Sequence, residues 1–275
     1  MKKEIYHEMP LSMLKANFEP VFCSGHYALV HLYEQEPEYY QHSVNVLKLR
    51  RPFILDNSIF ELEEAFNPNR FTNWIERLAI DSGNKDFIYI IPDVLDDRTA
   101  TIESAEAFLD GCKDLPGKPM AVVQGRTFVE LSQCYNALAL MGLERIGISF
   151  NCQAYTYNDA AGETKLEQWM NGRKAFVRST LAKRLSEPTK HPPIHLLGCS
   201  LPQEMKFYQK EKDIVSVDTS NPVVHGLLNI RYTDTGLKDK KSIKLIELFH
   251  EDLPNDNILD NITFNVLKFR EFTNG

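Results

Sequence analysis

The stretch IVSVDTSNPVVHG, residues 214–226, decides the fold that the sequence predicts. Its β-branched start leads into Asp218, and the polar Thr-Ser-Asn-Pro that follows is typical of a turn. Four other strand-like runs end in polar or small residues: Asp56 in ILDNSIFE, Asp93 in IIPDVLDD, Gln124 in AVVQG, and Gly147 and Ser149 in RIGISF. A parallel α/β barrel builds its active site from such residues at the carboxyl ends of its strands. We therefore expect these side chains to meet at one end of a barrel.

Helical patterns alternate with strand-like runs along the chain, which favours a parallel sheet. We expect strands at residues 21–24, 52–55, 87–91, 120–123, 145–149, 194–197, 214–217 and 227–232. We expect helices at residues 26–49, 70–80, 99–112, 127–141, 165–184, 201–210, 242–250 and 257–269. This rhythm predicts an α/β protein with a TIM-like (β/α)8 barrel. A single domain spans residues 1–275, with the barrel at about 21–233 and a C-terminal helical tail at 234–275.

Composition places the chain among ordinary globular proteins. Apolar residues make up 43% and charged residues 25% of the 275 positions, enough for one sizeable core. The net charge of −7 argues against nonspecific coating of nucleic acid. We see no signal peptide and no membrane span. The five cysteines are widely spaced, which predicts no zinc site, no cofactor and reduced thiols in a cytoplasm.

Taken in order, the strand ends resemble the tRNA-guanine transglycosylase superfamily over residues 53–226. The matching motifs are Asp56-Asn57-Ser58-Ile59-Phe60-Glu61, Pro92-Asp93, Val123-Gln124-Gly125, Ile146-Gly147-Ile148-Ser149, Leu197-Gly198 and Val217-Asp218. The cysteine-rich zinc site of the tRNA enzymes is absent, and the chain is shorter than they are. The chain is therefore most similar to the compact, phage-encoded DNA branch of this superfamily.

The resemblance implies a DNA-guanine transglycosylase, which exchanges guanine for a 7-deazaguanine through a covalent Asp glycosyl-enzyme intermediate. It implies that Asp218 is the nucleophile and that Asp56 moves the proton of the base. Two structural alternatives stay open. Asp218 could instead cap the helix that follows its strand. Asp56 could be a turn residue that bonds its own backbone.

The same resemblance implies a binding site for the base. A guanine-like edge presents donors to a carboxylate and a carbonyl to an amide, roles that suit Asp93 and Gln124. Backbone groups of Gly147 and Ile148 would approach closely, and Ser58 and Phe60 would complete the site, with Phe60 stacked on the base. The alternatives are a helix cap for Asp93 and a core position for Phe60.

A basic stretch, residues 165–212, holds ten Lys or Arg and four Asp or Glu. This excess favours a face that follows phosphates. The candidates are Arg173, Lys174, Arg178, Lys183 and Arg184, with His225 as a further contact. A solvated helix face and an ordinary loop histidine are the alternatives.

The expected partners are DNA, with tRNA less favoured, and a 7-deazaguanine base as co-substrate; a homodimer is possible. Three other functions remain open. They are a tRNA-guanine transglycosylase, a non-catalytic nucleic-acid-binding paralogue of that superfamily, and an unrelated barrel hydrolase that binds a metal. The last has no support from spacing, because His7, His26, His195 and His225 form no paired motif.

Overall fold

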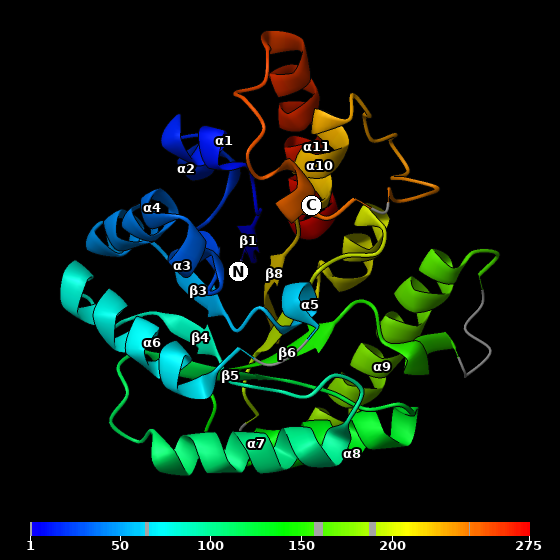
Figure 1. Cartoon of the computed structure of the whole chain (residues 1–275). Coiled ribbons are helices and arrows are strands. Elements are labelled where there is room, and N and C mark those ends of the chain that lie inside the picture. Colours follow the sequence, from blue (N-terminus) through cyan, green and yellow to red (C-terminus); the bar gives the residue numbers. More distant parts are fainter. Residues whose placement is uncertain (1, 64–65, 157–161, 187–190, 242) are drawn as a thin grey trace.

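The computed structural model describes residues 2–63, 66–156, 162–186, 191–241 and 243–275. Eight parallel strands form one sheet in the order β1-β8-β7-β6-β5-β4-β3-β2 (Figure 1). The strands are β1 (Glu4–Tyr6), β2 (His26–Leu29), β3 (Phe53–Asp56), β4 (Ile88–Ile90), β5 (Lys118–Val122), β6 (Arg145–Ser149), β7 (Ile194–Leu197) and β8 (Ile214–Asp218).

The sheet curves into a nearly closed barrel. At one edge β1 pairs with β8, which aligns Tyr6 with Asp218. Between β1 and β2, Ser24 N–H donates to the Ile5 carbonyl at 2.7 Å and Ile5 N–H donates to Ser24 Oγ at 2.9 Å. The predicted (β/α)8 TIM-like barrel, in a single domain with C-terminal helices, is therefore confirmed.

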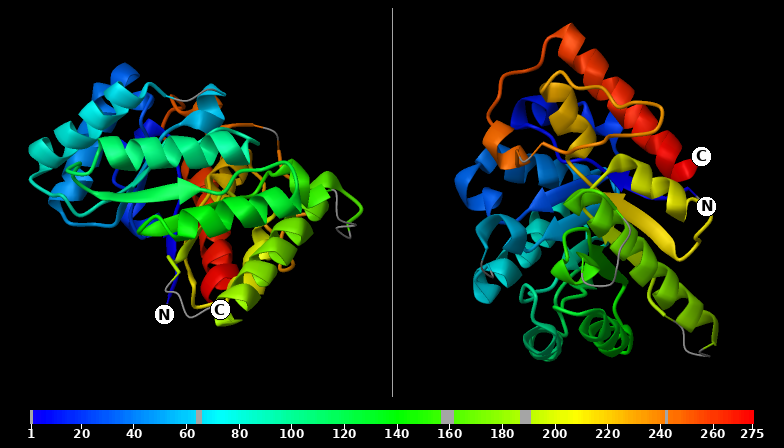
Figure 2. Two further views of the ribbon diagram at one scale, coloured as in Figure 1. Left: turned by 90° about the horizontal axis from the view of Figure 1, so that it is seen from below. Right: turned by 90° about the vertical axis from the view of Figure 1, so that its right-hand side faces the viewer.

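Helices cover the outside of the barrel (Figures 1 and 2). The α-helices are α1 (Leu11–Lys15), α2 (Glu19–Phe22), α3 (Leu32–Gln35), α4 (Pro37–Lys48), α5 (Ile59–Leu62), α6 (Pro68–Ser82), α7 (Arg98–Gly111), α8 (Phe128–Ala139), α9 (Lys165–Ser186), α10 (Asn221–Leu227) and α11 (Asp256–Asn274). Three 3-10 helices are η1 (Gln153–Thr156), η2 (Pro202–Tyr208) and η3 (Leu245–Leu248).

Local sequence signals explain where the barrel helices begin. The Asn67 side chain accepts from Arg70 N–H at the start of α6, and Pro68 occupies the first turn. Asp97 accepts from Ala100 N–H at the start of α7. Thr127 accepts from Glu130 N–H at the start of α8. These caps fix the loops that follow β3, β4 and β5, where the predicted site residues lie.

The two ends of the predicted barrel are wrong. Residues 21–24 are not a strand, because the short helix α2 begins at Glu19 and has Pro20 in its first turn. The first strand is instead β1, and the predicted helix at 26–49 begins with the fully buried strand β2. Residues 227–232 are not the last strand, since α10 occupies residues 221–227 and Asn229 turns the chain with φ of 60°. The barrel therefore runs from residue 4 to residue 218 rather than from about 21 to 233.

The C-terminal helix α11 closes the outer layer. It packs against α10 and η2, and its buried residues include Ile262, Val266 and Phe269. Lys3 N–H donates to Asn274 Oδ1 at 2.8 Å, so the two chain ends lie side by side (Figure 2). The predicted tail helix at 242–250 is the 3-10 helix η3 from residue 245, and residue 242 lies outside the described residues. None of the helices that the structure describes has the length and apolarity to cross a membrane.

Candidate active site

A pocket of about 720 Å³ opens at the carboxyl ends of the strands. The last residues of seven strands line it: Leu29, Asp56, Ile90, Val122, Ser149, Leu197 and Asp218. The structure therefore brings Asp56, Asp93, Gln124, Phe60 and Asp218 together, as the sequence analysis expected. Three expected residues are not on the lining: Ser58, Gly147 and Ile148. The Ile148 carbonyl accepts from Arg173 Nη1 at 3.3 Å, so it is already bonded inside the protein.

Asp218 lies at the end of β8 and is 5% exposed. His195 Nε2 lies 2.9 Å from its Oδ1, and Gly198 N–H lies 3.3 Å from both of its oxygens. Gly198 has φ of +63°, and a Cβ there would lie 2.3 Å from the Phe150 ring, so glycine is needed to present this N–H. Asp218 does not cap α10, whose N-cap is Ser220 without a side-chain bond. Its oxygens are thus held by the barrel and face the pocket.

A line of polar side chains runs from Asp218 down the inside of the barrel. His195 Nδ1 lies 2.7 Å from Ser216 Oγ, and the β7–β8 register places these two residues opposite each other. Arg145 Nη1 donates to Ser216 Oγ at 2.8 Å and to Glu4 Oε2 at 2.8 Å. The chain of contacts thus joins the pocket to the opposite end of the barrel.

With a neutral His195, the hydrogens of this line take one arrangement. Arg145 can only donate, so Ser216 accepts from it and has its own hydrogen free for His195 Nδ1. Nδ1 is then an acceptor, and Nε2 carries the hydrogen that His195 donates to Asp218. Burial, opposed by Asp218, lowers the pKa of His195, which favours this neutral imidazole. From Arg145 through Ser216 and His195, the donors of this line point toward the Asp218 carboxylate, while Arg145 also donates to Glu4 at the other end.

Asp56 sits across the pocket at the end of β3. Tyr27 OH donates to its Oδ2 and Ser58 N–H donates to its Oδ1, which is the turn contact expected from the Asp-Asn-Ser sequence. Burial first, and then the charge of Glu61, raises the pKa of Asp56 well above its usual value; the charge of Asp218 adds to this. Asp56 therefore holds a proton at a pH where ordinary aspartates are ionised.

Two further carboxyl groups belong to the site although we did not expect them. Glu8 follows β1 and Glu61 lies in α5, and both line the pocket. Burial raises the pKa of Glu61 to about 7. Burial, and then the charges of Glu61, Asp218 and Asp56, raises the pKa of Glu8 well above its usual value. Burial, and after it mutual repulsion, thus favours the protonated forms of these carboxyl groups.

Asp93 forms the other side of the pocket with two amides. Asn57 Nδ2 donates to one oxygen at 2.7 Å and Gln124 Nε2 donates to the other at 2.6 Å. Gln124 Oε1 accepts from Asp96 N–H at 3.2 Å. Burial raises the pKa of Asp93. Asp97 caps α7, so Asp93 is not the helix cap, and Gln124 keeps only its second N–H for a ligand.

Aromatic rings and lysines complete the walls. The ring centroids of Phe60 and Phe150 lie 6.3 Å apart. Lys240 Nζ lies 4.3 Å from the Phe150 ring centroid and donates to the Cys199 carbonyl at 3.3 Å, while Lys244 Nζ lies 5.1 Å from the Phe60 ring centroid. Burial lowers the pKa of Lys240. Stacking of a ligand on Phe60 stays a prediction.

The expected phosphate-binding face is wrong for two of its arginines. Arg173 is fully buried and pairs with Glu204 through contacts of 2.7 and 2.9 Å. Arg184 is buried and donates to Tyr135 OH and to the Pro192 carbonyl, each at 2.6 Å. Both side chains tie α9 to its neighbours and are not available to a surface ligand.

Four further residues were expected to contact the nucleic-acid backbone. Arg178 and Lys183 are exposed, and Lys174 Nζ lies 3.6 Å from the Phe207 ring centroid. His225 is not in a loop but is buried in α10, where Nδ1 contacts the Asn221 carbonyl at 2.9 Å. Binding of DNA or of a 7-deazaguanine base is not tested by these positions and stays a prediction.

The sequence analysis missed two site residues that lie within strands, His195 and Tyr27. Their rings stack, with centroids 6.3 Å apart and an angle of 9° between the ring planes. Glu8 follows the three-residue strand β1, which was too short to recognise. The available signal was the pairing of neighbouring strands: once β7 and β8 are placed side by side, His195 and Ser216 fall opposite each other two residues before their strand ends.

Comparisons with known proteins bear on the predicted function. No family model and no curated protein matches the chain. Among solved structures, the chain is similar to a 4-hydroxy-2-oxoglutarate aldolase/2-deydro-3-deoxyphosphogluconate aldolase from TTHB1, with 11% identity, a TM-score of 0.44 and coverage of 98% of this chain and 94% of that one. It is also similar to a phosphoenolpyruvate phosphomutase from Streptomyces platensis subsp. rosaceus, with 12% identity, a TM-score of 0.43 and coverage of 82% and 78%. A third is the N-acetylneuraminate lyase from Mycoplasma synoviae, with 9% identity, a TM-score of 0.44 and coverage of 82% and 74%.

These comparisons contradict the predicted function. The structures named above are an aldolase, a phosphomutase and a lyase, and none is a transglycosylase. The assignment as a DNA-guanine transglycosylase, with the tRNA-enzyme and non-catalytic alternatives, is therefore corrected. At such low identity no neighbour's own activity passes to this chain. The function must therefore be argued from the site.

Proposed function

We propose that this chain is an enzyme that performs general acid–base cleavage of a polar bond in a small molecule, with Asp218 as the base or nucleophile and Asp56 as the acid. One observation carries the proposal. Two carboxyl groups in one pocket differ in their surroundings: two N–H donors converge on Asp218, whereas at Asp56 burial and nearby negative charge outweigh the Tyr27 and Ser58 donors and raise the pKa. Such a divided pair supplies both halves of an acid–base reaction.

The lining also indicates what kind of molecule the pocket takes. Seven carboxyl groups line it: Glu8, Asp56, Glu61, Glu63, Asp93, Asp96 and Asp218. Protonated and ionised carboxyl groups both have oxygens that accept hydrogen bonds, so a ligand with O–H or N–H donors suits this lining. Phe60, Phe150 and Trp169 add apolar ring surface. We infer a donor-rich substrate with one apolar face, such as a sugar, an amino sugar or a nitrogen-containing ring.

A binding screen followed by kinetics tests the proposal. The melting temperature of the full chain is measured with each member of a panel of sugars, amino sugars and nitrogen heterocycles. Derivatives of the ligands that raise it most are then assayed for bond cleavage. Asp218→Asn and Asp56→Asn should each lower kcat by roughly 10²–10⁴-fold, the usual contribution of a general acid or base. The control is Asp110→Asn, an exposed carboxyl on α7. Turnover in the Asp218→Asn protein within threefold of wild type would overturn the proposal.

A further inference from the structure

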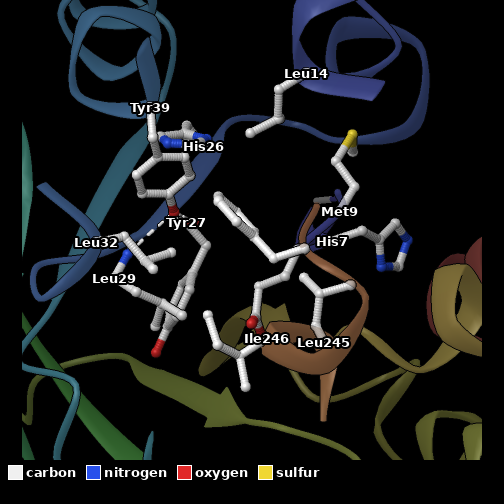
Figure 3. Close-up of a pocket in the computed structure, with 12 residues that line it drawn as sticks. His7, Met9, Leu14, His26, Tyr27, Leu29, Leu32, Tyr39, Leu245 and Ile246 are labelled. Atoms are coloured by element: carbon white, nitrogen blue, oxygen red, sulfur yellow. Dashed lines mark hydrogen bonds between the residues drawn. The ribbon is translucent and has the colours of Figure 1, made fainter. Parts of the chain in front are cut away.

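A second group of chemically active side chains lies outside the pocket. Glu19 of α2, His26 of β2 and His42 of α4 place one ligand atom each within 4.8 Å of the others. The Glu19 and His26 side chains are 1% and 2% exposed, and that of His42 is 18% exposed. His26 and Tyr27 leave β2 in different directions (Figure 3). Tyr27 lines the pocket that holds Asp218, whereas His26 contacts Glu19.

Hydrogen bonds show which ring nitrogen of His26 faces the Glu19 carboxylate. Ser43 OH donates to the Tyr39 carbonyl at 3.2 Å, so Ser43 Oγ accepts from His26 Nε2, 3.0 Å away. Nδ1 is therefore the ring nitrogen that meets the Glu19 carboxylate, which it contacts. Either a proton or a metal ion between these two atoms would satisfy both groups. An imidazole whose outer N–H is held by an oxygen is also the usual state of a histidine that ligates a metal.

His42 and Arg51 approach the same carboxylate. His42 Nε2 lies 3.3 Å from Glu19 Oε2, and the rings of His26 and His42 meet at 70° with centroids 5.0 Å apart. Arg51 Nη1 donates to Glu19 Oε2 at 2.8 Å, which orients the carboxylate and leaves Oε1 directed at His26. Ligating carboxylates are commonly held by such outer hydrogen bonds.

We propose that Glu19, His26 and His42 bind one divalent transition-metal ion of the zinc type. Two imidazole nitrogens and one carboxylate oxygen suit Zn²⁺, and water would fill the fourth position on the side where His42 reaches solvent. The ion would join α2, β2 and α4, three elements that are separate in sequence. Because such a site does not exist in the unfolded chain, binding would stabilise the fold.

Calorimetry with the full chain tests the site. After removal of metal with a chelator, titration with ZnCl₂ should show one saturable site, and the melting temperature should rise with Zn²⁺. His42→Ala removes a partly exposed ligand and should weaken Zn²⁺ binding by at least about tenfold, as loss of a group at a metal site commonly does. His250→Ala, at an exposed histidine outside the group, is the matched control and should bind as wild type.

The outcomes are distinguishable even if a variant is less stable. Co²⁺ loading of the wild type gives visible absorption when imidazole nitrogens ligate the ion, independently of melting. Loss of this absorption in His42→Ala, with its retention in His250→Ala, would support the site. Absence of saturable Zn²⁺ binding by the wild type, or equal affinity in wild type and His42→Ala, would overturn it.

Discussion

His195 Nε2 lies 2.9 Å from Asp218 Oδ1, and this contact couples the candidate catalytic carboxylate to the interior of the barrel. Behind His195 stand Ser216 and Arg145, each bonded to the next. A buried network whose members are all satisfied is rigid and gives its end group one orientation. Asp218 is therefore positioned by the barrel strands themselves and not by the mobile part of a loop.

Loss of the imidazole donor should impair turnover more than folding. His195→Phe keeps a ring in the barrel but removes the N–H that faces Asp218. A hydrogen bond to a charged group contributes about 1.5–3 kcal/mol, so kcat should fall by roughly ten- to a hundredfold. His195→Gln, whose amide can donate in place of Nε2, should recover part of the loss. Equal turnover by all three proteins would show that His195 does not act on Asp218.

Ser216 supplies the hydrogen bond to His195 Nδ1. In Ser216→Ala, His195 Nδ1 and one Arg145 N–H lose their partner inside the barrel, which should cost about 1–3 kcal/mol of unfolding free energy. The ¹⁵N chemical shift of His195 Nδ1 should change with the loss of this donor, whereas Nε2 should keep its hydrogen toward Asp218. Ser216→Thr retains the hydroxyl and should retain the Nδ1 shift. An unchanged spectrum in Ser216→Ala would contradict the proposed line of donors.

The carboxyl group of Glu61 should make the protein less stable as pH rises. Its pKa is raised by burial from 4.5 to about 7, so the folded chain keeps a proton that the unfolded chain releases. The stabilisation is complete below about pH 4.5 and is lost as pH rises through about 7. Urea unfolding at several pH values should show this decline, at most about 3.5 kcal/mol for a pKa change of about 2.5 at 1.4 kcal/mol per pKa unit. Glu61→Gln should flatten the curve; an equally steep curve in that variant would contradict the assignment.

Arg173 should behave as a structural residue. It is paired with Glu204, and both side chains are fully buried. Arg173→Met leaves Glu204 buried without its partner and should cost about 3–5 kcal/mol of unfolding free energy. The double variant Arg173→Met with Glu204→Leu removes both charges and should recover most of this loss. Denaturant unfolding measures both, and a double variant as unstable as the single one would contradict the pairing.

The sequence analysis recovered the barrel because its signals are local. Runs such as residues 145–149 and 194–197 are apolar and bounded by turns, and the structure places β6 and β7 there. The first two strands were missed for physical reasons. β1 has only three residues, and β2 shares its apolar spacing with the helices that follow, so hydrogen bonding to β3 and not the local pattern makes it a strand.

Apart from Phe60 in α5, the predicted residues that line the pocket lie at or shortly after strand ends. Asp56 and Asp218 end their strands, and Asp93 and Gln124 lie within three residues after theirs. Arg173 and Arg184 were misplaced because a helical basic run does not show which face it buries. The partners that bury them, Glu204 and Tyr135, lie 31 and 49 residues away along the chain. Such long-range pairing cannot be read from spacing.

The proton on Asp56 is the central claim, and a ¹³C NMR titration tests it most directly. With ¹³C-labelled aspartate, the Asp56 carboxyl signal is assigned by its loss in Asp56→Asn and followed from pH 4 to 9. We predict a protonated Asp56 at pH 7, and titration at a lower pH in Asp218→Asn, where the neighbouring negative charge is gone. An Asp56 carboxyl that is ionised at pH 5 in the wild type, and unchanged in Asp218→Asn, would contradict the proposed division of acid and base.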